Sequence, residues 1–219
     1  MRPWAACASV ALATLILAFS ASLLGSCQDT RRGEHVVPNK SQSQELRIVV
    51  PQASWEPIFF REIDERAKLA NLASLRTIAL PNDDLQIRLW FQAGHYGMDG
   101  IVIRRTSGAW SATYLYGFSK DPNFKKYEEQ MQEPQSGWDV TWQRLVEADL
   151  LAMPDASQVG CNVFGKDGAV FIVETNVNKT YRTYMYDNPA FAKCDEAKYM
   201  LKLIDTINEE FGLEWPVTQ

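Results

Sequence analysis

One glycine-rich loop of this sequence carries side chains whose types and spacing could do acid/base chemistry. His95 and Asp99 lie in the segment Gly94-His95-Tyr96-Gly97-Met98-Asp99-Gly100, and an imidazole near a carboxylate can move protons. No nucleophile in a recognisable context accompanies them, and the chain has no G-x-S-x-G, H-E-x-x-H, Walker or G-x-G-x-x-G motif. We therefore expect a hairpin loop with a solvated histidine here, and not an active site.

A second group of candidates consists of arginine and aromatic side chains expected on the polar face of a β-sheet. The candidate binding residues are Arg88, Trp90, Arg104, Arg182 and Tyr184, which would share that face with Ser111 and Glu174. Arginine and aromatic residues are enriched in binding hot spots. The same composition also suits a face that a helix covers, and we favour the covered face. The aromatic residues would also suit contact with a carbohydrate or a peptide, but aromatic side chains more often pack in the hydrophobic core.

Composition and charge narrow the class of protein. The chain has 219 residues, of which 46% are hydrophobic and 22% charged, which is typical of a folded domain and not of a disordered chain. The formal net charge of −5 argues against a nucleic-acid partner, since phosphate binding needs a concentrated basic surface. With two histidines and no C-x-x-C pair, we expect no metal site, and we expect no cofactor.

The N-terminal segment is the most informative part of the sequence. Arg2 precedes an uncharged, mostly apolar stretch at 4–24, and Leu24-Gly25-Ser26-Cys27 follows. This tetrapeptide resembles the lipobox of bacterial lipoproteins. The resemblance implies that Cys27 is thioether-linked to a diacylglycerol, that the signal peptide is cut before it, and that the new N-terminus is acylated, with palmitate as an expected chain. Gln28 in place of Asp implies the outer membrane over inner-membrane retention.

Two other interpretations of this segment stay open. It could be a conventional cleaved signal with an incidental cysteine, or an uncleaved span, since about 20 apolar residues can cross a bilayer. On the lipoprotein interpretation, 1–26 is the signal peptide, 27–45 a lipid-anchored flexible tether and 46–219 a single domain. The periplasm is oxidising, so Cys161 and Cys194 are a candidate disulfide; the alternative is two buried free thiols.

Alternation, turn residues and helical spacing predict the elements of the domain. We expect strands at 46–50 and 85–92, hairpins of 101–106 with 109–116 and of 169–176 with 181–187, and helices at 54–70, 141–153 and 195–211. The first hairpin should turn at Ser107-Gly108 and the second near Asn178-Lys179, with Asp195 capping the last helix and Gly212 ending it. The predicted fold is α+β, a mainly antiparallel sheet built from hairpins with about three helices packed on it.

The two hairpins also resemble each other. Asp-Gly opens each of them and an X-Pro-X-Phe turn follows each, at 121–124 and 188–191. They could be copies of one unit with an offset of about 70 residues, or a chance likeness of Tyr- and Thr-rich strands. The sequence therefore leaves an internal duplication as an alternative.

The sequence predicts a membrane-anchored, extracytoplasmic lipoprotein of the bacterial cell envelope, facing the periplasm or the outer membrane. It would act as a non-catalytic binding or envelope-accessory module. Its expected partners are the lipid bilayer, through acylated Cys27, and an envelope protein or peptide. One alternative is a hydrolase-type or acid/base enzyme that uses His95 and Asp99. Another is a structural spacer domain with no specific ligand.

Overall fold

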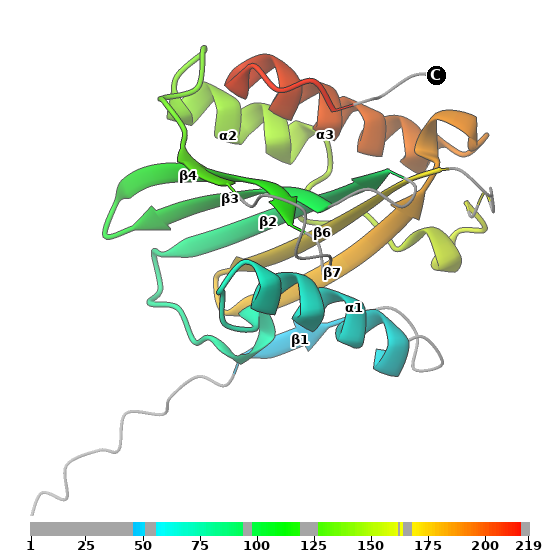
Figure 1. The fold of residues 1–219 in the computed structure, drawn as a ribbon, viewed down its shortest axis with the longest axis horizontal. Coiled ribbons are helices and arrows are strands. Elements are labelled where there is room, and N and C mark those ends of the chain that lie inside the picture. Colours follow the sequence, from blue (N-terminus) through cyan, green and yellow to red (C-terminus); the bar gives the residue numbers. More distant parts are fainter. Residues whose placement is uncertain are drawn as a thin grey trace, which may run out of the picture. The chain divides into compact units, whose positions relative to one another are not determined.

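The computed structural model describes residues 46–50, 56–93, 98–118, 127–161, 163 and 168–215, with backbone alone at 56–59, 62, 93 and 118. Residues His95 and Cys27 lie outside these ranges. In chain order the elements are β1 (Arg47–Val49), α1 (Glu56–Leu69), η1 (Leu75–Thr77), β2 (Leu85–Ala93), β3 (Met98–Thr106), β4 (Ala109–Phe118), β5 (Tyr127–Gln130), α2 (Trp138–Glu147), η2 (Ala156–Gln158), β6 (Ala169–Val177), β7 (Thr180–Asp187), η3 (Pro189–Phe191) and α3 (Asp195–Phe211) (Figure 1).

The strands form one seven-stranded sheet in the order β1-β7-β6-β2-β3-β4-β5. All neighbours pair antiparallel except β1 and β7, which are parallel. The α+β fold with a mainly antiparallel sheet and three α-helices is therefore confirmed. The predicted cross-strand pairs of the first hairpin are confirmed as well: Arg105 lies opposite Trp110, Ile103 opposite Ala112, and Ile101 opposite Tyr114.

Both hairpins turn through two residues with positive φ. Ser107 and Gly108 have φ of 51° and 83°, and Asn178 and Lys179 have φ of 49° and 57°. Two consecutive left-handed residues make the turn whose twist matches the right-handed twist of the flanking strands. The turns therefore fix the registers of β3 with β4 and of β6 with β7.

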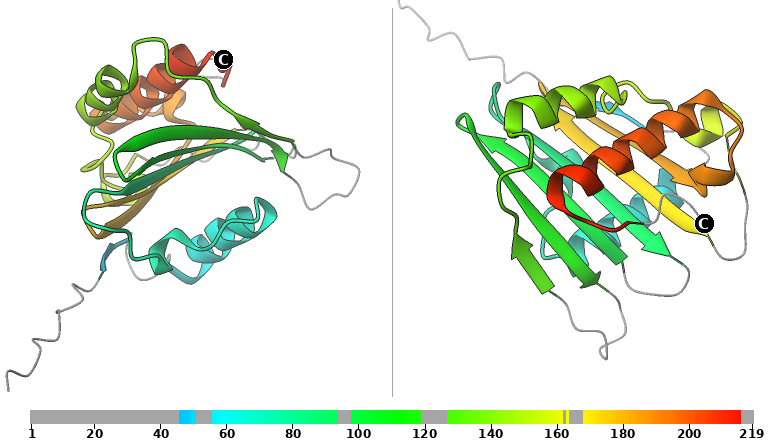
Figure 2. Two further views of the ribbon diagram at one scale, coloured as in Figure 1. Left: turned by 90° about the vertical axis from the view of Figure 1, so that its left-hand side faces the viewer. Right: turned by 90° about the horizontal axis from the view of Figure 1, so that it is seen from above.

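The alternation of β2 divides the sheet into two buried faces. Leu85, Ile87 and Leu89 belong to a core cluster that includes residues of α2 and α3, whereas Trp90 belongs to a cluster that includes Phe60 of α1. Figure 2 shows the same arrangement, with α2 and α3 on one side of the sheet and α1 on the other. We call these the α2/α3 face and the α1 face.

The helices differ in detail from the sequence-based expectation. Cys194, and not Asp195, occupies the N-cap position of α3, and Asp195 begins its first turn. Gly212 ends α3 in the left-handed conformation, as predicted. Helix α2 begins three residues earlier than predicted and ends at Glu147, because the chain turns at Asp149, which has a φ of 62°.

The structure does not show an internal duplication. The second X-Pro-X-Phe segment forms η3, but the first falls in 119–126, outside the described residues. In sequence, strand β2 precedes the first hairpin, whereas η2 precedes the second. Within the described ranges, no helix is both long and apolar enough to cross a membrane.

Candidate functional site

The first candidate site is a set of polar side chains on the α1 face, which we call the buried polar cluster: Arg88, Trp90, Glu174 and Tyr181. The Glu174 side chain has no exposed surface. Its Oε2 accepts a hydrogen bond from Trp90 Nε1 at 2.8 Å, and its Oε1 accepts one from the Tyr181 hydroxyl at 3.1 Å. Arg88 Nη1 lies 3.9 Å from Glu174 Oε2. Three neighbouring strands therefore place their polar groups around one carboxylate.

Burial dominates the electrostatics of this cluster. It raises the pKa of the Glu174 carboxyl, which Arg88 and the bonds from Trp90 and Tyr181 oppose in part, and it lowers the pKa of the Arg88 guanidinium. Arg88 Nη2 also donates to the backbone oxygen of Ala73 at 2.9 Å, just before η1. Because all four side chains are buried, the cluster is closed to solvent and joins the sheet to the segment that covers it.

The predicted binding residues do not form one patch. Arg104 pairs with Gln86 across β2 and β3, so it shares the α1 face with Arg88 and Trp90. Arg182 and Tyr184 lie on the α2/α3 face instead. There, Arg182 Nη2 donates to the carbonyl oxygens of Ala152 and Met153 at 3.1 Å, and the Tyr184 hydroxyl donates to Leu150 O at 3.0 Å.

The cause of this difference is the register of β6 with β7. Glu174 pairs with Thr183, so Thr183 and its alternate neighbours share the face of Glu174. Arg182 and Tyr184 point the opposite way for the same reason. The expectation that they share a face with Arg88 is therefore wrong.

Asp99, the predicted partner of His95, has other partners in the structure. Its Oδ2 accepts a hydrogen bond from the Tyr114 hydroxyl at 3.1 Å, and its Oδ1 accepts one from the Gly117 amide at 2.9 Å. The pairing of Asp99 with His95 falls outside the described residues. Asp99 thus links β3 to β4, close to the irregularity in their register between Met98 and Gly100.

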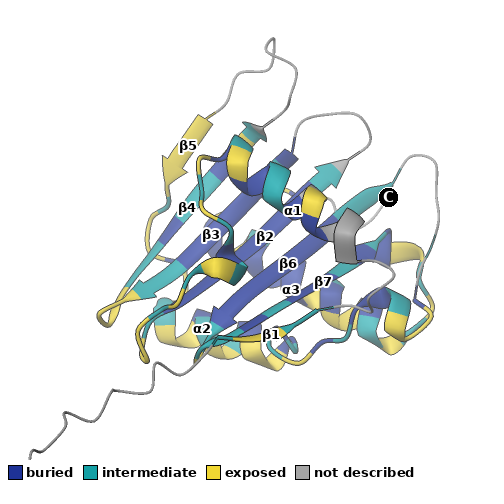
Figure 3. Cartoon of the chain, turned by 90° about the horizontal axis from the view of Figure 1, so that it is seen from below, coloured by how far each residue is buried: buried dark blue, intermediate teal, exposed yellow. Residues whose placement is uncertain are grey.

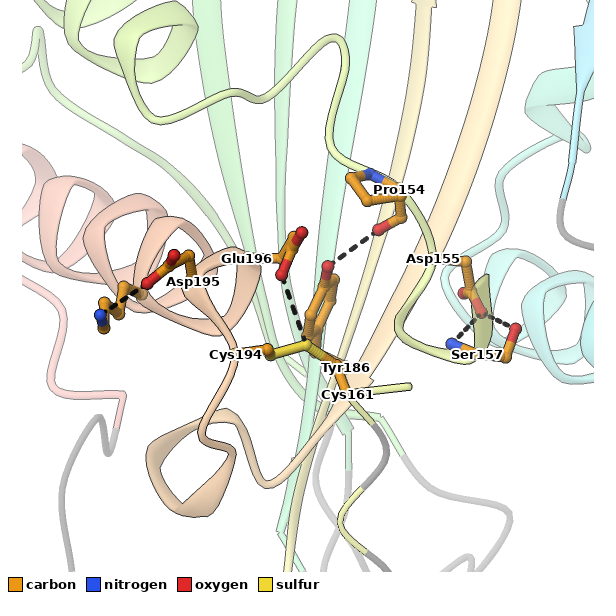
Figure 4. The surroundings of a disulfide bond; sticks show 9 residues. Pro154, Asp155, Ser157, Cys161, Tyr186, Cys194, Asp195 and Glu196 are labelled. Atoms are coloured by element: carbon orange, nitrogen blue, oxygen red, sulfur yellow. Dashed lines mark hydrogen bonds and ion pairs between the residues drawn. A yellow bond between two sulfur atoms is a disulfide. The ribbon is translucent and has the colours of Figure 1, made fainter. Parts of the chain in front are cut away.

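A disulfide joins Cys161 to Cys194, with 5.8 Å between their Cα atoms (Figure 4). It ties the segment after η2 to the N-cap of α3. The Tyr186 hydroxyl donates to Pro154 O at 2.9 Å beside it, and a Glu196 carboxylate oxygen lies 3.9 Å from Cys161 Sγ. The two sulfurs and this carboxylate lie within 4.8 Å of one another, but sulfurs bonded to each other cannot bind a metal as thiolates.

A second candidate site lies at the other end of the sheet and is open to solvent. It is a hollow of about 350 Å³, which we call the tyrosine hollow, lined by Tyr114, Tyr116, Tyr127, Glu128 and Glu129. The Tyr116 and Tyr127 side chains are 50% and 53% exposed, and their ring centroids are 6.0 Å apart. Figure 3 shows β5 as an exposed strand beyond β4.

Two strands and the C-terminal segment position the rings of the hollow. Tyr116 pairs with Tyr127, and Tyr114 pairs with Glu129, so these four side chains share one face of the β4–β5 ladder. Trp215 packs against Tyr114 at 6.4 Å between ring centroids and anchors it to the core on the α2/α3 face. Burial raises the pKa of the Tyr114 hydroxyl, so the hydroxyl stays protonated.

The hollow combines electron-rich ring faces with carboxylates. No hydrogen bond or ion pair joins the Glu128 or Glu129 side chain to another residue in the described ranges. Aromatic faces attract cations, and a nearby carboxylate adds to that attraction. Sequence reasoning placed Tyr114 and Tyr116 on a strand but missed β5, because Tyr127-Glu128-Glu129-Gln130 has no apolar alternation.

Comparisons with protein-family models, with curated proteins and with solved structures found no match to this chain.

Proposed function

We propose that this protein is a lipid-anchored, extracytoplasmic module of the bacterial cell envelope that binds a partner without catalysing a reaction. Its anchor is Cys27, acylated after removal of 1–26, and the segment before β1 tethers the domain. The proposed partners are the bilayer, through this anchor, and an envelope protein or peptide. The proposal combines the lipobox-like tetrapeptide with two features of the domain.

The disulfide carries the extracytoplasmic part of the proposal. Cys161 and Cys194 are 33 residues apart in sequence, yet the fold brings their Cα atoms to a separation that a disulfide spans. Disulfides persist in oxidising compartments such as the periplasm and are rare in the reducing cytosol. This pairing therefore supports a domain that is exported after synthesis.

The tyrosine hollow supports the binding part. In the described residues, exposed Tyr116 and Tyr127 lie beside two unpartnered carboxylates. Of the other candidates, Arg88, Trp90 and Tyr184 are buried, Arg182 donates to backbone oxygens, and Arg104 is half-buried. Exposed aromatic side chains with polar neighbours are typical of binding surfaces. We therefore place the binding site at β4 and β5.

The test is metabolic labelling of the protein with a palmitate analogue in a Gram-negative host. The wild type and a Cys7→Ser variant should be labelled, because Cys7 lies in the leader outside the tetrapeptide, and Cys27→Ser should not. Intact mass of the membrane-extracted protein should show loss of 1–26 and addition of the lipid. Equal labelling of Cys27→Ser, or a mass that includes the leader, would overturn the proposal.

A further inference from the structure

We infer that the outer edge of β5 and the tyrosine hollow together bind an extended segment of a partner polypeptide that carries lysine or arginine. The segment adds to the sheet as a further strand next to β5, and one of its cationic side chains enters the hollow. This inference rests on the proposed function, of which it names the class of partner. It is carried by the free strand edge, by the charge on that edge, and by the rings beside it.

The first observation is a strand edge that pairs with no other strand of the described residues. β5 is the last strand of the sheet order, and all four of its residues are exposed. The Met131 amide donates to Ala112 O at 2.9 Å on the β4 side. Since backbone groups alternate in direction along an antiparallel ladder, those of Glu128 and Gln130 point away from β4. They can pair with an incoming strand, which is how many domains capture extended peptides.

The second observation is the charge of this edge. Glu128 and Glu129 lie on opposite faces of β5, since successive side chains of a strand alternate. Both lack a hydrogen-bonding or ionic partner among the described residues. Opposite charges on adjacent strands stabilise their pairing, so a strand with lysine or arginine opposite these residues is favoured.

The third observation is the position of the aromatic rings. Tyr116, Tyr127 and Glu129 share one face of the ladder. A basic side chain on that face of the incoming strand would meet the Glu129 carboxylate and the faces of two tyrosine rings. A cation near such rings gains cation–π attraction in addition to its ion pair. The hollow therefore favours a basic residue at one position of the segment.

The same charge argues against pairing of two β5 strands. Because directly opposite residues of an antiparallel pair have the same backbone direction, a symmetric pair of β5 strands from two copies would place Glu128 opposite Glu128 or Glu129 opposite Glu129. Like charges directly opposite are destabilising. The sheet's other edge, β1, contributes three residues and carries Arg47. Pairing of β5 with β1 of another copy is thus the self-association that an experiment must distinguish.

The test uses the lipidated protein in nonionic detergent and the synthetic peptide acetyl-Thr-Lys-Val-Lys-Thr-Lys-Val-amide, with binding measured by calorimetry. Two further peptides carry N-methyl groups on alternate amides, one on the even and one on the odd positions. Strand addition predicts that one methylated peptide loses affinity by about tenfold or more while the other binds like the parent. Equal behaviour of the two methylated peptides would overturn strand addition.

Protein variants test the site. Glu129→Lys and Tyr127→Ala should each weaken binding of the parent peptide, the charge reversal by about tenfold or more. Glu133→Lys is the matched control, because Glu133 is exposed in the next loop, does not line the hollow and should bind like the wild type. All three side chains are exposed, so thermal unfolding should be unchanged. An equal loss in Glu129→Lys and Glu133→Lys, or no binding by the wild type, would overturn the inference.

Two readouts separate this inference from the proposed function. Lipid labelling of Cys27 does not depend on β5. A protein that is labelled but does not bind the peptide would therefore overturn only the inference. Sedimentation of the detergent-solubilised protein tests whether a second copy of this chain occupies the edge of β5. A dimer that forms in the wild type and dissociates in Glu129→Lys would show that it does, and would overturn the inference of a partner polypeptide.

Discussion

Loss of the Cys161–Cys194 disulfide should destabilise the domain by an amount that follows from the length of the loop that the bond closes. The bond closes a loop over a sequence separation of 33 residues. In the chain-entropy account, closing such a loop removes about 12–13 cal/mol/K from the unfolded state, or about 3.7 kcal/mol at 25 °C. Because a small domain has a net stability of about 5–15 kcal/mol, this is a large fraction of the total.

The assay is urea unfolding of the purified protein followed by tryptophan fluorescence. The free energy of unfolding should be about 3–4 kcal/mol lower in Cys161→Ser/Cys194→Ser than in the oxidised wild type. Wild type that has been unfolded, reduced and refolded in a thiol reagent is the control, since it keeps both sulfur atoms and lacks only the bond. It should unfold close to the variant, and the reagent should leave the variant unchanged.

A different result would refute this reasoning. If the oxidised wild type and the double variant differ by less than about 1 kcal/mol, the bond does not constrain the unfolded chain as calculated. If the protein isolated from an oxidising compartment titrates with free thiols at Cys161 and Cys194, the pair is not bonded, and the support that it gives to export is lost.

Two further predictions concern the α1 face. Burial raises the pKa of Glu174, so its contribution to stability is fully present below the ordinary carboxyl pKa of about 4.3 and is lost as the pH rises through the raised value. The difference in unfolding free energy between the wild type and Glu174→Gln, measured in urea at a series of pH values, should therefore shift against the wild type as the pH rises; a flat or opposite trend would contradict this. Gly100→Ala should cost about 1–3 kcal/mol in the same assay, because its Cβ would lie 2.6 Å from Trp90 Cε3, and Trp90 is held by its bond to Glu174; an unchanged midpoint would show that the ring can move away.

The sequence predicted the parts of the fold that depend on local pattern. The alternation of β2 and the Ser107-Gly108 turn fix which residues face the core and how β3 pairs with β4. The apolar spacing of α3 and its final Gly212 locate that helix to within a residue. In each case the signal lies within about 10–17 consecutive residues, where periodicity and turn chemistry are strongest.

The parts that sequence reasoning missed depend on contacts between distant segments. β5 is a strand because it pairs with β4, and nothing in its composition distinguishes it from a charged loop. The parallel pairing of β1 with β7 joins residues more than 130 positions apart, as in Arg47 with Thr180. The faces of Arg182 and Tyr184 depend on the β6–β7 register, in which a shift of one residue exchanges the two faces.

The same dependence explains the outcome for the candidate site. Alternation along the strands correctly predicts that Arg88, Trp90 and Glu174 share a face, but their contacts depend on the pairing of β2 with β6, since Glu174 is 84 residues from Trp90 in sequence. The tyrosine hollow depends on β5 lying next to β4, so sequence alone could suggest its tyrosines but not their grouping with Glu128 and Glu129.

The covalent ring between Cys161 and Cys194 contains the whole β6–β7 hairpin. Within the sheet order, β6 lies between β7 and β2, so this ring passes through the interior of the sheet. A protease that cuts the backbone once inside the ring would leave both fragments linked through the two sulfurs. Such a nicked chain would run as a single species until it is reduced, and its two pieces would stay together in a compartment rich in peptidases.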